Sequence, residues 1–384
     1  MGLFGNLAGP GDIIGIDIGS HSIKVVQVAN TRTGYTLTRA GSTPTPHEAV
    51  KQGVVEDRVA IAEALRTLLR TLGITTTSVV AAVAGPTVVV RQVKLPNMTE
   101  QQLRKSIYWE ARNFISFPVE DSLLEFQILG TSTNDGTPQM DVMLVATPRI
   151  LVDSRVEALE LAGLDPIAIE LEPFALMRAV IDLPNGTLGT QETVALVDIG
   201  STFTHISIIS NGSFVLSRSV NVAGQTFTGA IATVLGIETM QAEEIKENEL
   251  RVVTDEFTRA QLSPVGQEAS RALESPLEEL VREIRRSFAF YDYQQGPGGT
   301  TRTADGVSRI VLTGGSAKMI GLDTFLNSQL SIPVEIVDLF RANTVQLPPD
   351  ADPDELRTQV PLMATAFGLA LREPMLLREK VGYR

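Results

Sequence analysis

The sequence contains two similar segments that lie half a chain apart. Residues 13–28 read IIGIDIGSHSIKVVQV, and residues 194–209 read VALVDIGSTFTHISII. When Asp17 is aligned on Asp198, both segments show an apolar run, then Asp-Ile-Gly-Ser, then a second run with alternating apolar residues. Each segment predicts a strand, a tight polar turn and an antiparallel return strand. Such a duplication favours two related lobes that face each other.

The rest of the chain alternates predicted strands and helices. Residues 310–326 (IVLTGGSAKMIGLDTFL) read as a buried strand, a Gly-Gly turn and a helix. Apolar periodicity predicts strands near 78–83, 87–95, 123–129 and 141–147. The same periodicity predicts helices over 57–72, 99–114, 149–162, 225–235, 239–247, 268–291 and 360–372, and a strand that enters a helix over 167–183. This alternation places the chain in the α/β class.

Composition removes several classes of function. The 384 residues include 45 acidic and 32 basic side chains and no cysteine. The acidic balance opposes nucleic-acid binding, and the absence of cysteine excludes disulfides, thiolate catalysis and cysteine-ligated metals. The N-terminal residues lack the pattern of a secretory signal, and no run of 18 apolar residues is present. We therefore expect a cytoplasmic protein that meets a membrane only through a partner.

The two predicted turns have the chemistry of phosphate-binding loops. Glycine-containing turns expose backbone N–H groups, and the small hydroxyls beside them can approach an anion closely. These groups are Gly19, Ser20, Ser22 and Lys24 in the first hairpin, and Gly200, Ser201 and Thr202 in the second. Asp17 and Asp198 end the strands beside the turns, and carboxylates near phosphates repel them unless a divalent cation lies between. The pair therefore predicts Mg²⁺, held largely through water.

Two further patterns suggest a nucleoside site. The turn at Gly314, Gly315 and Ser316 leaves room for a flat base or a ribose against the backbone, and Glu243 and Lys246 share a helix face that could bond ribose hydroxyls. Taken alone, each pattern is also typical of ordinary structure: a hairpin turn, a strand-to-helix turn, a surface ion pair. Their combined order, with one of them duplicated, favours nucleotide binding.

This order of motifs resembles the actin-like ATPase superfamily over nearly the whole chain. The resemblance assigns residues to four motifs. These are the first phosphate loop (Asp17, Gly19, Ser20, Ser22 and Lys24), the second (Asp198, Gly200, Ser201 and Thr202), the adenosine turn (Gly314, Gly315 and Ser316) and the A-E-x-x-K helix of the bacterial actins (Glu243 and Lys246). It implies ATP with Mg²⁺ as cofactors, bound between the lobes.

Two more residues acquire roles through this resemblance. Glu172, at the head of the first connecting helix, matches the position that orients attacking water in MreB-like proteins. His205 matches a histidine near that water in eukaryotic actin, although packing beside the hairpin is the reading we favour for it. Thr202 stands where bacterial actins commonly have glycine, so we expect slow hydrolysis or none, and at most a weak ATPase.

The segment 94–129 (KLPNMTEQQLRKSIYWEARNFISFPVEDSLLEFQIL) resembles the signature of the PilM family, on the FtsA/PilM branch of this superfamily. The residues that carry this resemblance are Leu95-Pro96, Trp109-Glu110-Ala111, Phe117-Pro118 and Glu120-Asp121. The fold implied is α/β and actin-like, a duplicated ribonuclease H-like architecture with two lobes and an inserted small α/β subdomain. The implied divisions are 1–86 (first lobe), 87–163 (insert, partner binding), 164–190 (return to the first lobe), 191–359 (second lobe, with 225–305 as its smaller subdomain) and 360–384 (C-terminal connecting helix and tail).

The PilM resemblance implies an ATP-binding scaffold of type IV pilus assembly, in the cytoplasm and peripheral to the inner membrane. Its implied partner is the N-terminal cytoplasmic peptide of a PilN-like protein, held in a groove between the insert and the first lobe. Contacts with other pilus assembly proteins and self-association stay open. The alternatives are an FtsA-like polymerising division protein, which needs a membrane helix near the apolar Met375, Leu376 and Leu377, and a small-molecule kinase, which needs a substrate pocket beside Glu172.

Overall fold

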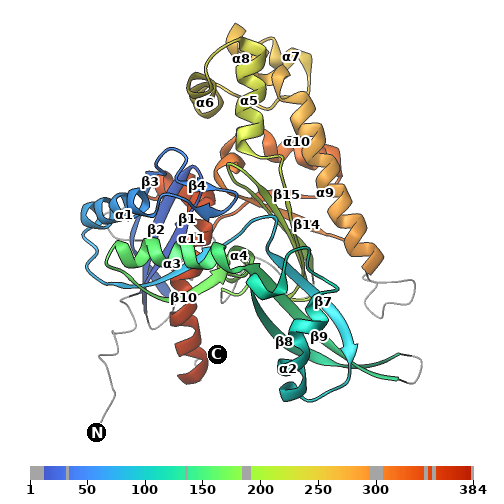
Figure 1. Cartoon of the computed structure of the whole chain (residues 1–384). Coiled ribbons are helices and arrows are strands. Elements are labelled where there is room, and N and C mark those ends of the chain that lie inside the picture. Colours follow the sequence, from blue (N-terminus) through green and yellow to red (C-terminus); the bar gives the residue numbers. More distant parts are fainter. Residues whose placement is uncertain are drawn as a thin grey trace.

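The computed structural model describes residues 13–31, 34–134, 137–183, 192–294, 306–340, 345–347 and 352–381. The predicted domain boundary at 190 and the end of the smaller subdomain at 305 lie outside these residues. The described chain forms two lobes side by side, and a third unit extends from them at the lower right of Figure 1.

The first lobe is built on a six-stranded sheet in the order β10-β6-β1-β2-β3-β16. The first hairpin pairs β1 with β2 antiparallel, whereas β6 and β10 continue the sheet in parallel. The strands are β1 (Ile14–Ile18), β2 (Ser22–Asn30), β3 (Tyr35–Pro44), β6 (Ser78–Val83), β10 (Asp165–Leu171) and β16 (Val345–Gln346), with a small hairpin of β4 (Val50–Lys51) and β5 (Val54–Val55).

Helices cover both faces of this sheet. On one face, α1 (Arg58–Leu72) and α3 (Arg149–Leu161) bury their apolar sides against the isoleucines of β1. On the other face lie α4 (Glu172–Val180) and α11 (Pro353–Val381), whose apolar residues also contact the second sheet. The two connecting helices therefore lie between the lobes, and their shared core holds the lobes together.

The second lobe repeats the hairpin arrangement within an eight-stranded sheet, in the order β15-β14-β11-β12-β13-β7-β9-β8. Here β11 pairs antiparallel with β12 and parallel with β14, as β1 does with β2 and β6. The first five strands are β11 (Thr193–Ile199), β12 (Thr204–Ser210), β13 (Ser213–Val220), β14 (Arg309–Thr313) and β15 (Val334–Ile336). The predicted duplication is thus a repeat of three-dimensional structure.

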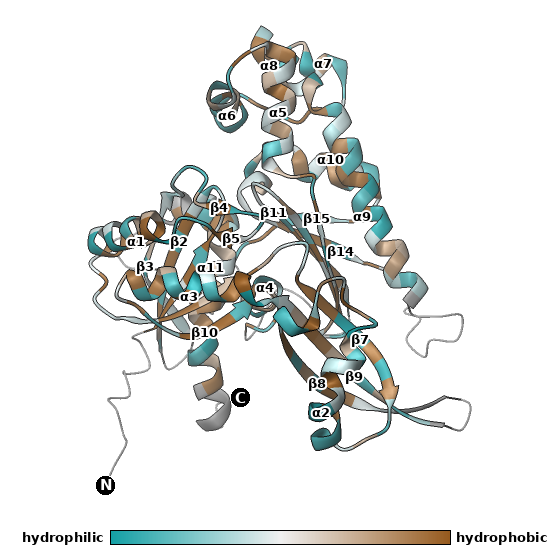
Figure 2. Cartoon of the chain, viewed as in Figure 1, coloured by the Kyte–Doolittle hydropathy of each residue, from teal (hydrophilic) through white to brown (hydrophobic). Residues whose placement is uncertain are grey.

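Helices also cover the second lobe. Its helices are α5 (Gly224–Leu235), α6 (Thr239–Asn248), α7 (Glu256–Arg259), α8 (Pro264–Ala272), α9 (Glu274–Gln294), the short η2 (Gly315–Lys318) and α10 (Leu322–Leu330). Helices α5 to α8 form a small helical unit at the top of Figure 1. The outer side of α9 is hydrophilic, as is that of α1 (Figure 2).

The third unit consists of β7 (Val89–Pro96), α2 (Glu100–Ala111), η1 (Val119–Asp121), β8 (Ser122–Asn134) and β9 (Thr137–Pro148). Its own core packs α2 against these strands. Strand β7 pairs with β13 at Leu216 and Arg91, so the insert continues the sheet of the second lobe. Helix α3, which the predicted division groups with the insert, packs with α1 on the first lobe.

Two helix predictions are wrong in detail. The single helix predicted over 268–291 is two helices, α8 and α9, with the break at Leu273. Pro276 has no N–H to donate to the carbonyl four residues back, so the helical hydrogen bonds cannot continue from α8 into α9. In the first turn of α9 that N–H is not needed, and proline is tolerated there. The C-terminal helix predicted over 360–372 begins earlier and ends later, as α11.

Candidate nucleotide site

A cavity of about 570 Å³ lies between the lobes, and we call it the interlobe cleft. Residues from both hairpins, from α4, α6 and η2, and from α3 and α11 line it. The structure brings every predicted site residue to this cleft: Asp17, Gly19, Ser20, Ser22, Lys24, Glu172, Asp198, Gly200, Ser201, Thr202, His205, Glu243, Lys246, Gly314, Gly315 and Ser316. Segments separated by most of the chain thus converge on one space.

The first loop is held by its own backbone. The Gly19 N–H donates to the Ser22 carbonyl over 3.1 Å, and the Thr45 hydroxyl donates to the Gly19 carbonyl over 2.7 Å. A Cβ on Gly19 would lie 2.9 Å from Lys24 Nζ and 3.0 Å from the Ser22 carbonyl oxygen, so the turn leaves little room for a larger residue. Lys24 Nζ lies 3.0 Å from Asp17 Oδ2, and both side chains are buried.

The second loop is joined to the first loop and to α5. The Gly200 N–H donates to the Phe203 carbonyl over 3.0 Å, and the Gly224 N–H at the start of α5 donates to the Gly200 carbonyl over 3.0 Å. Across the cleft, the hydroxyls of Ser20 and Thr202 share a hydrogen bond of 2.7 Å. The two loops therefore touch directly at their hydroxyl groups.

Three carboxylates give the cleft an excess of negative charge. Burial, together with the charge of Asp17, raises the pKa of Asp198 to about 7. Burial and the charges of Asp17 and Asp198 raise the pKa of Glu172 to about 8. Lys24 and Arg155 act against these shifts without cancelling them, so the carboxyl groups are only partly compensated. A divalent cation bound through oxygen ligands would supply that compensation, so Asp17 and Asp198 fit a Mg²⁺ site.

Lys24 and His205 differ in charge. Burial acts to lower the pKa of Lys24, but its contact with Asp17 outweighs burial and raises that pKa above its usual value. Burial lowers the pKa of His205 to about 4, so the ring is neutral at pH 7. Its Nδ1 shares a 2.7 Å hydrogen bond with the Ser219 hydroxyl, while Nε2 lies 3.9 Å from Glu172 Oε2. His205 therefore packs beside the hairpin as a neutral ring next to Glu172.

The residues predicted at the adenosine end also pack together. Lys246 Nζ donates to both carboxylate oxygens of Glu243 over 2.7 Å and to the Thr228 hydroxyl over 2.9 Å, and that hydroxyl donates to Glu243. Burial acts to raise the pKa of Glu243, but these hydrogen bonds bring it below its usual value. At the facing turn, Gly314 has φ +87°, and a Cβ there would lie 2.4 Å from Asp198 Oδ1. Only glycine fits that position.

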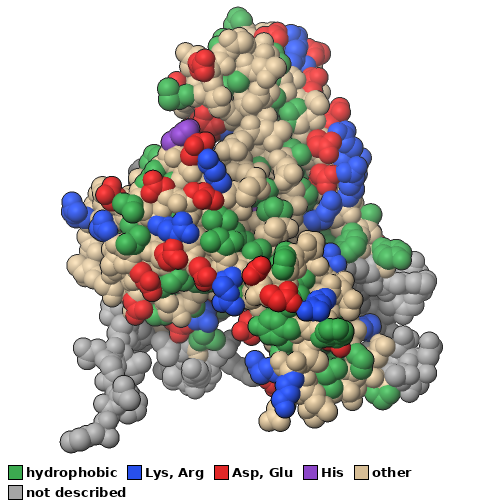
Figure 3. All heavy atoms as spheres, viewed as in Figure 1, with side chains coloured by type: hydrophobic (Ala, Val, Ile, Leu, Met, Phe, Trp, Pro, Cys, Tyr) green, Lys and Arg blue, Asp and Glu red, His purple; other side chains and the backbone are tan. Residues whose placement is uncertain are grey.

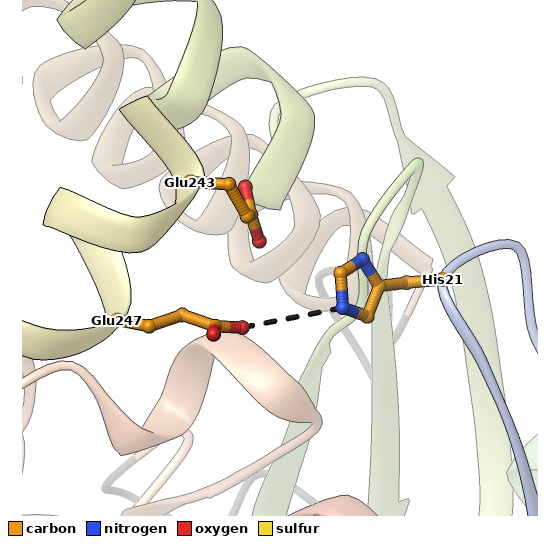
Figure 4. Close-up of side chains that lie close together, drawn as sticks. All are labelled: His21, Glu243 and Glu247. Carbon is orange, nitrogen blue, oxygen red and sulfur yellow. Dashed lines mark ion pairs between the residues drawn. The ribbon is translucent and has the colours of Figure 1, made fainter. Parts of the chain in front are cut away.

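A further contact spans the mouth of the cleft. His21, from the β1–β2 turn, and Glu243 and Glu247, from α6, each bring one potential metal-ligand atom to within 4.8 Å of the others (Figure 4). His21 Nε2 lies 4.0 Å from Glu247 Oε1. Because Lys246 already compensates Glu243, we describe this group as a contact between the lobes.

Arg155 is among the cleft residues that the sequence analysis missed. Arg155, on α3, lines the cleft and is 2% exposed. A signal existed in the sequence, because Leu151, Arg155 and Ala158 share one helix face at spacings of four and three, which places an arginine among buried residues.

Outside the cleft, the 94–129 signature divides into core and surface. Leu95 and Ala111 are buried in the small core, whereas Trp109 is 70% exposed, with the Arg112 guanidinium 5.1 Å from its ring centre. Arg112 also donates to Glu120 over 2.6 Å.

Elsewhere, basic and acidic side chains alternate on the visible face, as they do in the ion pairs along α9 (Figure 3). Arg282 and Arg286 on α9 are therefore paired with glutamates of the same helix.

Within the described residues, no helix is long and apolar enough to cross a bilayer. The apolar cluster near the C-terminus is partly used in packing, because Met375 contacts the shared core. Leu376 is exposed, and the side chain of Leu377 lies outside the described residues.

Comparison with known proteins extends over nearly the whole chain. The chain is 22% identical to the cell division protein FtsA of Bacillus subtilis strain 168, with 97% of this chain and 86% of FtsA covered. It superposes on a solved PilM-PilN type IV pilus biogenesis complex with a TM-score of 0.77, at 26% identity over 95% of this chain and 99% of that one. MreB 5 of Spiroplasma citri bound to AMPPNP matches at 14% identity with a TM-score of 0.50, over 96% and 98%.

These similarities confirm the predicted actin-like fold. The family model described as type IV pilus assembly protein PilM matches residues 15–374. The chain therefore belongs to the PilM family of actin-like scaffold proteins of type IV pilus assembly.

Proposed function

We propose that the chain binds ATP with Mg²⁺ in the interlobe cleft and, in that state, docks the N-terminal cytoplasmic peptide of a PilN-like inner-membrane protein. The observation that carries the nucleotide half is the convergence of both Gly-Ser loops, the Gly314 turn and the α6 pair on one cleft. MreB 5, a protein of the same fold, is solved with AMPPNP, and this adds support.

Within the cleft, the proposed roles follow from position. The two loops would hold the phosphates, with Lys24 as the cation beside the first loop. Asp17 and Asp198 would hold Mg²⁺, which when bound neutralises phosphate charge. Glu243 and Lys246 would contact the ribose, while Gly314, Gly315 and Ser316 would lie against the adenosine.

We propose that hydrolysis is slow or absent. Glu172 is the only candidate we assign to orienting a water molecule, and with a pKa raised to about 8 it holds its proton at pH 7 until a cation is bound. A protonated carboxyl accepts a proton poorly, so the empty cleft is a poor general base. Thr202 occupies the loop position beside Ser20, where its hydroxyl is already hydrogen-bonded.

The docking half rests on the PilM-PilN complex, which shares 26% identity with this chain and superposes closely. We propose a groove between the insert and the first lobe as the peptide site. Helix α3 connects these parts, because it follows β9 of the insert directly and packs on α1. Through this partner the protein would be held at the inner membrane from the cytoplasmic side.

The test is a titration with a labelled peptide from the cytoplasmic N-terminus of the neighbouring single-span pilus protein. Fluorescence anisotropy would be followed with Mg²⁺-ATP, with Mg²⁺-ADP and without nucleotide, and a scrambled peptide of equal charge is the control. We expect saturable binding of the native peptide alone. A difference between nucleotides would measure the coupling free energy. Binding of neither peptide in any state would overturn the docking role.

A further inference from the structure

The interlobe cleft contains a buried cation that none of the predicted roles uses. Arg155 extends from α3 into the lining of the cleft, with 2% of its surface exposed. Burying a guanidinium is costly unless an anion or several acceptors compensate its charge. The groups that compensate the charge of Arg155 therefore indicate whether this residue is available to an anionic ligand.

The described residues satisfy Arg155 only in part. Its Nη1 donates to the carbonyls of Gly53 and, over 3.2 Å, of Leu151. Its Nε is buried without a hydrogen-bond partner, and within the described ranges no carboxylate lies within 4.0 Å of the side chain. Lys24, in contrast, is paired with Asp17 at 3.0 Å. Among the described residues, Arg155 is therefore a buried cation without an anionic partner.

The electrostatic surroundings place Arg155 at one end of the cleft. Burial lowers its pKa, while the charges of Glu172 and Asp17 act in the opposite direction. Its positive charge acts on Glu172 more strongly than that of Lys24 does, whereas the cation that acts on Asp198 is Lys24. Arg155 thus belongs to the Glu172 end, where the proposed function has the attacking water and where the terminal phosphate that this water attacks must also lie.

We propose that Arg155 binds the terminal phosphate of a nucleoside triphosphate and so makes the cleft distinguish triphosphate from diphosphate. This inference rests on the proposed nucleotide site. Planar guanidinium groups bind phosphate oxygens with charge-assisted hydrogen bonds, and the guanidinium of Arg155 lines the cleft with no carboxylate partner among the described residues. A diphosphate would not extend to this end of the cleft.

The position of Arg155 also links the phosphate to α3. In the structure Arg155 ties α3 to the β4–β5 turn at Gly53, and Ser154 accepts a 3.1 Å hydrogen bond from the Val55 N–H. The helix begins directly after β9 of the insert. A phosphate that engages Arg155 would therefore restrain the one helix that joins the insert to the first lobe.

The test compares AMPPNP with ADP, both with Mg²⁺, by isothermal titration calorimetry. For Arg155→Met we expect AMPPNP affinity to fall tenfold or more and ADP affinity to stay within about threefold, and Arg155→Lys should recover part of the difference. Arg149→Met is the matched control, since Arg149 lies exposed on the same helix and should bind like the unmodified chain. Equal loss of both nucleotides, or loss of neither, overturns the proposal.

A second measurement needs no variant and therefore does not depend on whether the Arg155 variants fold. In the unmodified protein, amide hydrogen exchange over 149–161 and 50–55 should be slower with AMPPNP than with ADP, because only AMPPNP engages Arg155. Identical exchange with both nucleotides would contradict the proposal. If the unmodified protein binds neither nucleotide, the failure belongs to the proposed nucleotide site itself.

Discussion

Asp198, a proposed Mg²⁺ ligand, should lower the stability of the ligand-free protein. Its pKa is raised to about 7 in the cleft, so between about pH 4 and pH 7 the folded protein holds a proton that the unfolded chain releases. Stability of the nucleotide-free protein must then fall as pH rises through that range and level off above it. This loss of stability belongs to the ligand-free protein, and a bound cation would offset it by compensating the charge of Asp198.

Replacement of Asp198 by asparagine should therefore stabilise the nucleotide-free protein at pH 8, by roughly 1 to 3 kcal/mol, and change little at pH 4.5. Urea denaturation at the two pH values measures this. Asp153→Asn, at an exposed position on α3, is the control and should shift neither curve. If the Asp198 variant were less stable at pH 8, its carboxylate would have to be compensated already.

The same residue predicts a pH dependence of binding. Because Mg²⁺ needs the ionised carboxylate, affinity for Mg²⁺-ATP should rise between pH 6 and pH 8 by as much as tenfold per pH unit. In Asp198→Asn the affinity should be lower at every pH, and its rise with pH should flatten. Calorimetry at three pH values, repeated with EDTA, would show the trend. An equally steep rise in the variant would remove Asp198 from the metal site.

Among the elements, α11 makes the closest contacts. A Cβ on Gly368 would lie 1.8 Å from the Ala175 carbonyl oxygen of α4, and a Cβ on Gly15 of β1 would lie 2.0 Å from the Ala366 carbonyl oxygen of α11. The two connecting helices and the central strand of the first sheet thus meet backbone to backbone, behind the proposed phosphate loops.

Gly368→Ala should accordingly destabilise the protein by about 3 kcal/mol or more, because the backbone must move to admit the methyl group. Gly229→Ala is a matched control inside another helix, α5, where an added Cβ meets open space. That change should stabilise the protein by roughly 0.5 to 1 kcal/mol through helix propensity. Chemical denaturation of both variants gives the comparison, and equal effects would mean that α4 and α11 can separate at little cost.

The elements also show what the sequence can and cannot predict. The hairpins, the Gly-Gly turn and most helices follow from local periodicity and turn residues, and their order alone led to the cleft. The continuation of the second sheet into the insert rests on one residue pair, Leu216 and Arg91, with no local signature. Arg155 was missed for a related reason: Gly53, whose carbonyl it contacts, and most of the cleft that it lines are distant in sequence, and local periodicity does not report such contacts.

For the whole molecule, the important feature is that the lobes share a core. Val26 of the first sheet and Val194 and Leu196 of the second belong to one hydrophobic cluster, in which α4 and α11 lie between the sheets. The Ser20–Thr202 and His21–Glu247 contacts add polar links at the mouth of the cleft. We expect the two lobes of such a protein to unfold together, because unfolding of one lobe exposes α4 and α11, against which the other lobe also packs.

We therefore expect a single thermal transition that moves upward as a unit when nucleotide is added. At a free Mg²⁺-ATP concentration 100 times the dissociation constant, linkage predicts about 2.7 kcal/mol of added stability. Scanning calorimetry with and without nucleotide measures it, and EDTA, which removes the cation, should reverse most of the shift. Two transitions, of which only one responds to nucleotide, would show instead that the lobes unfold independently and that the ligand contacts only one of them. In that case nucleotide binding could not change the arrangement of the insert. Such coupling requires the bound ligand to hold both lobes in one arrangement.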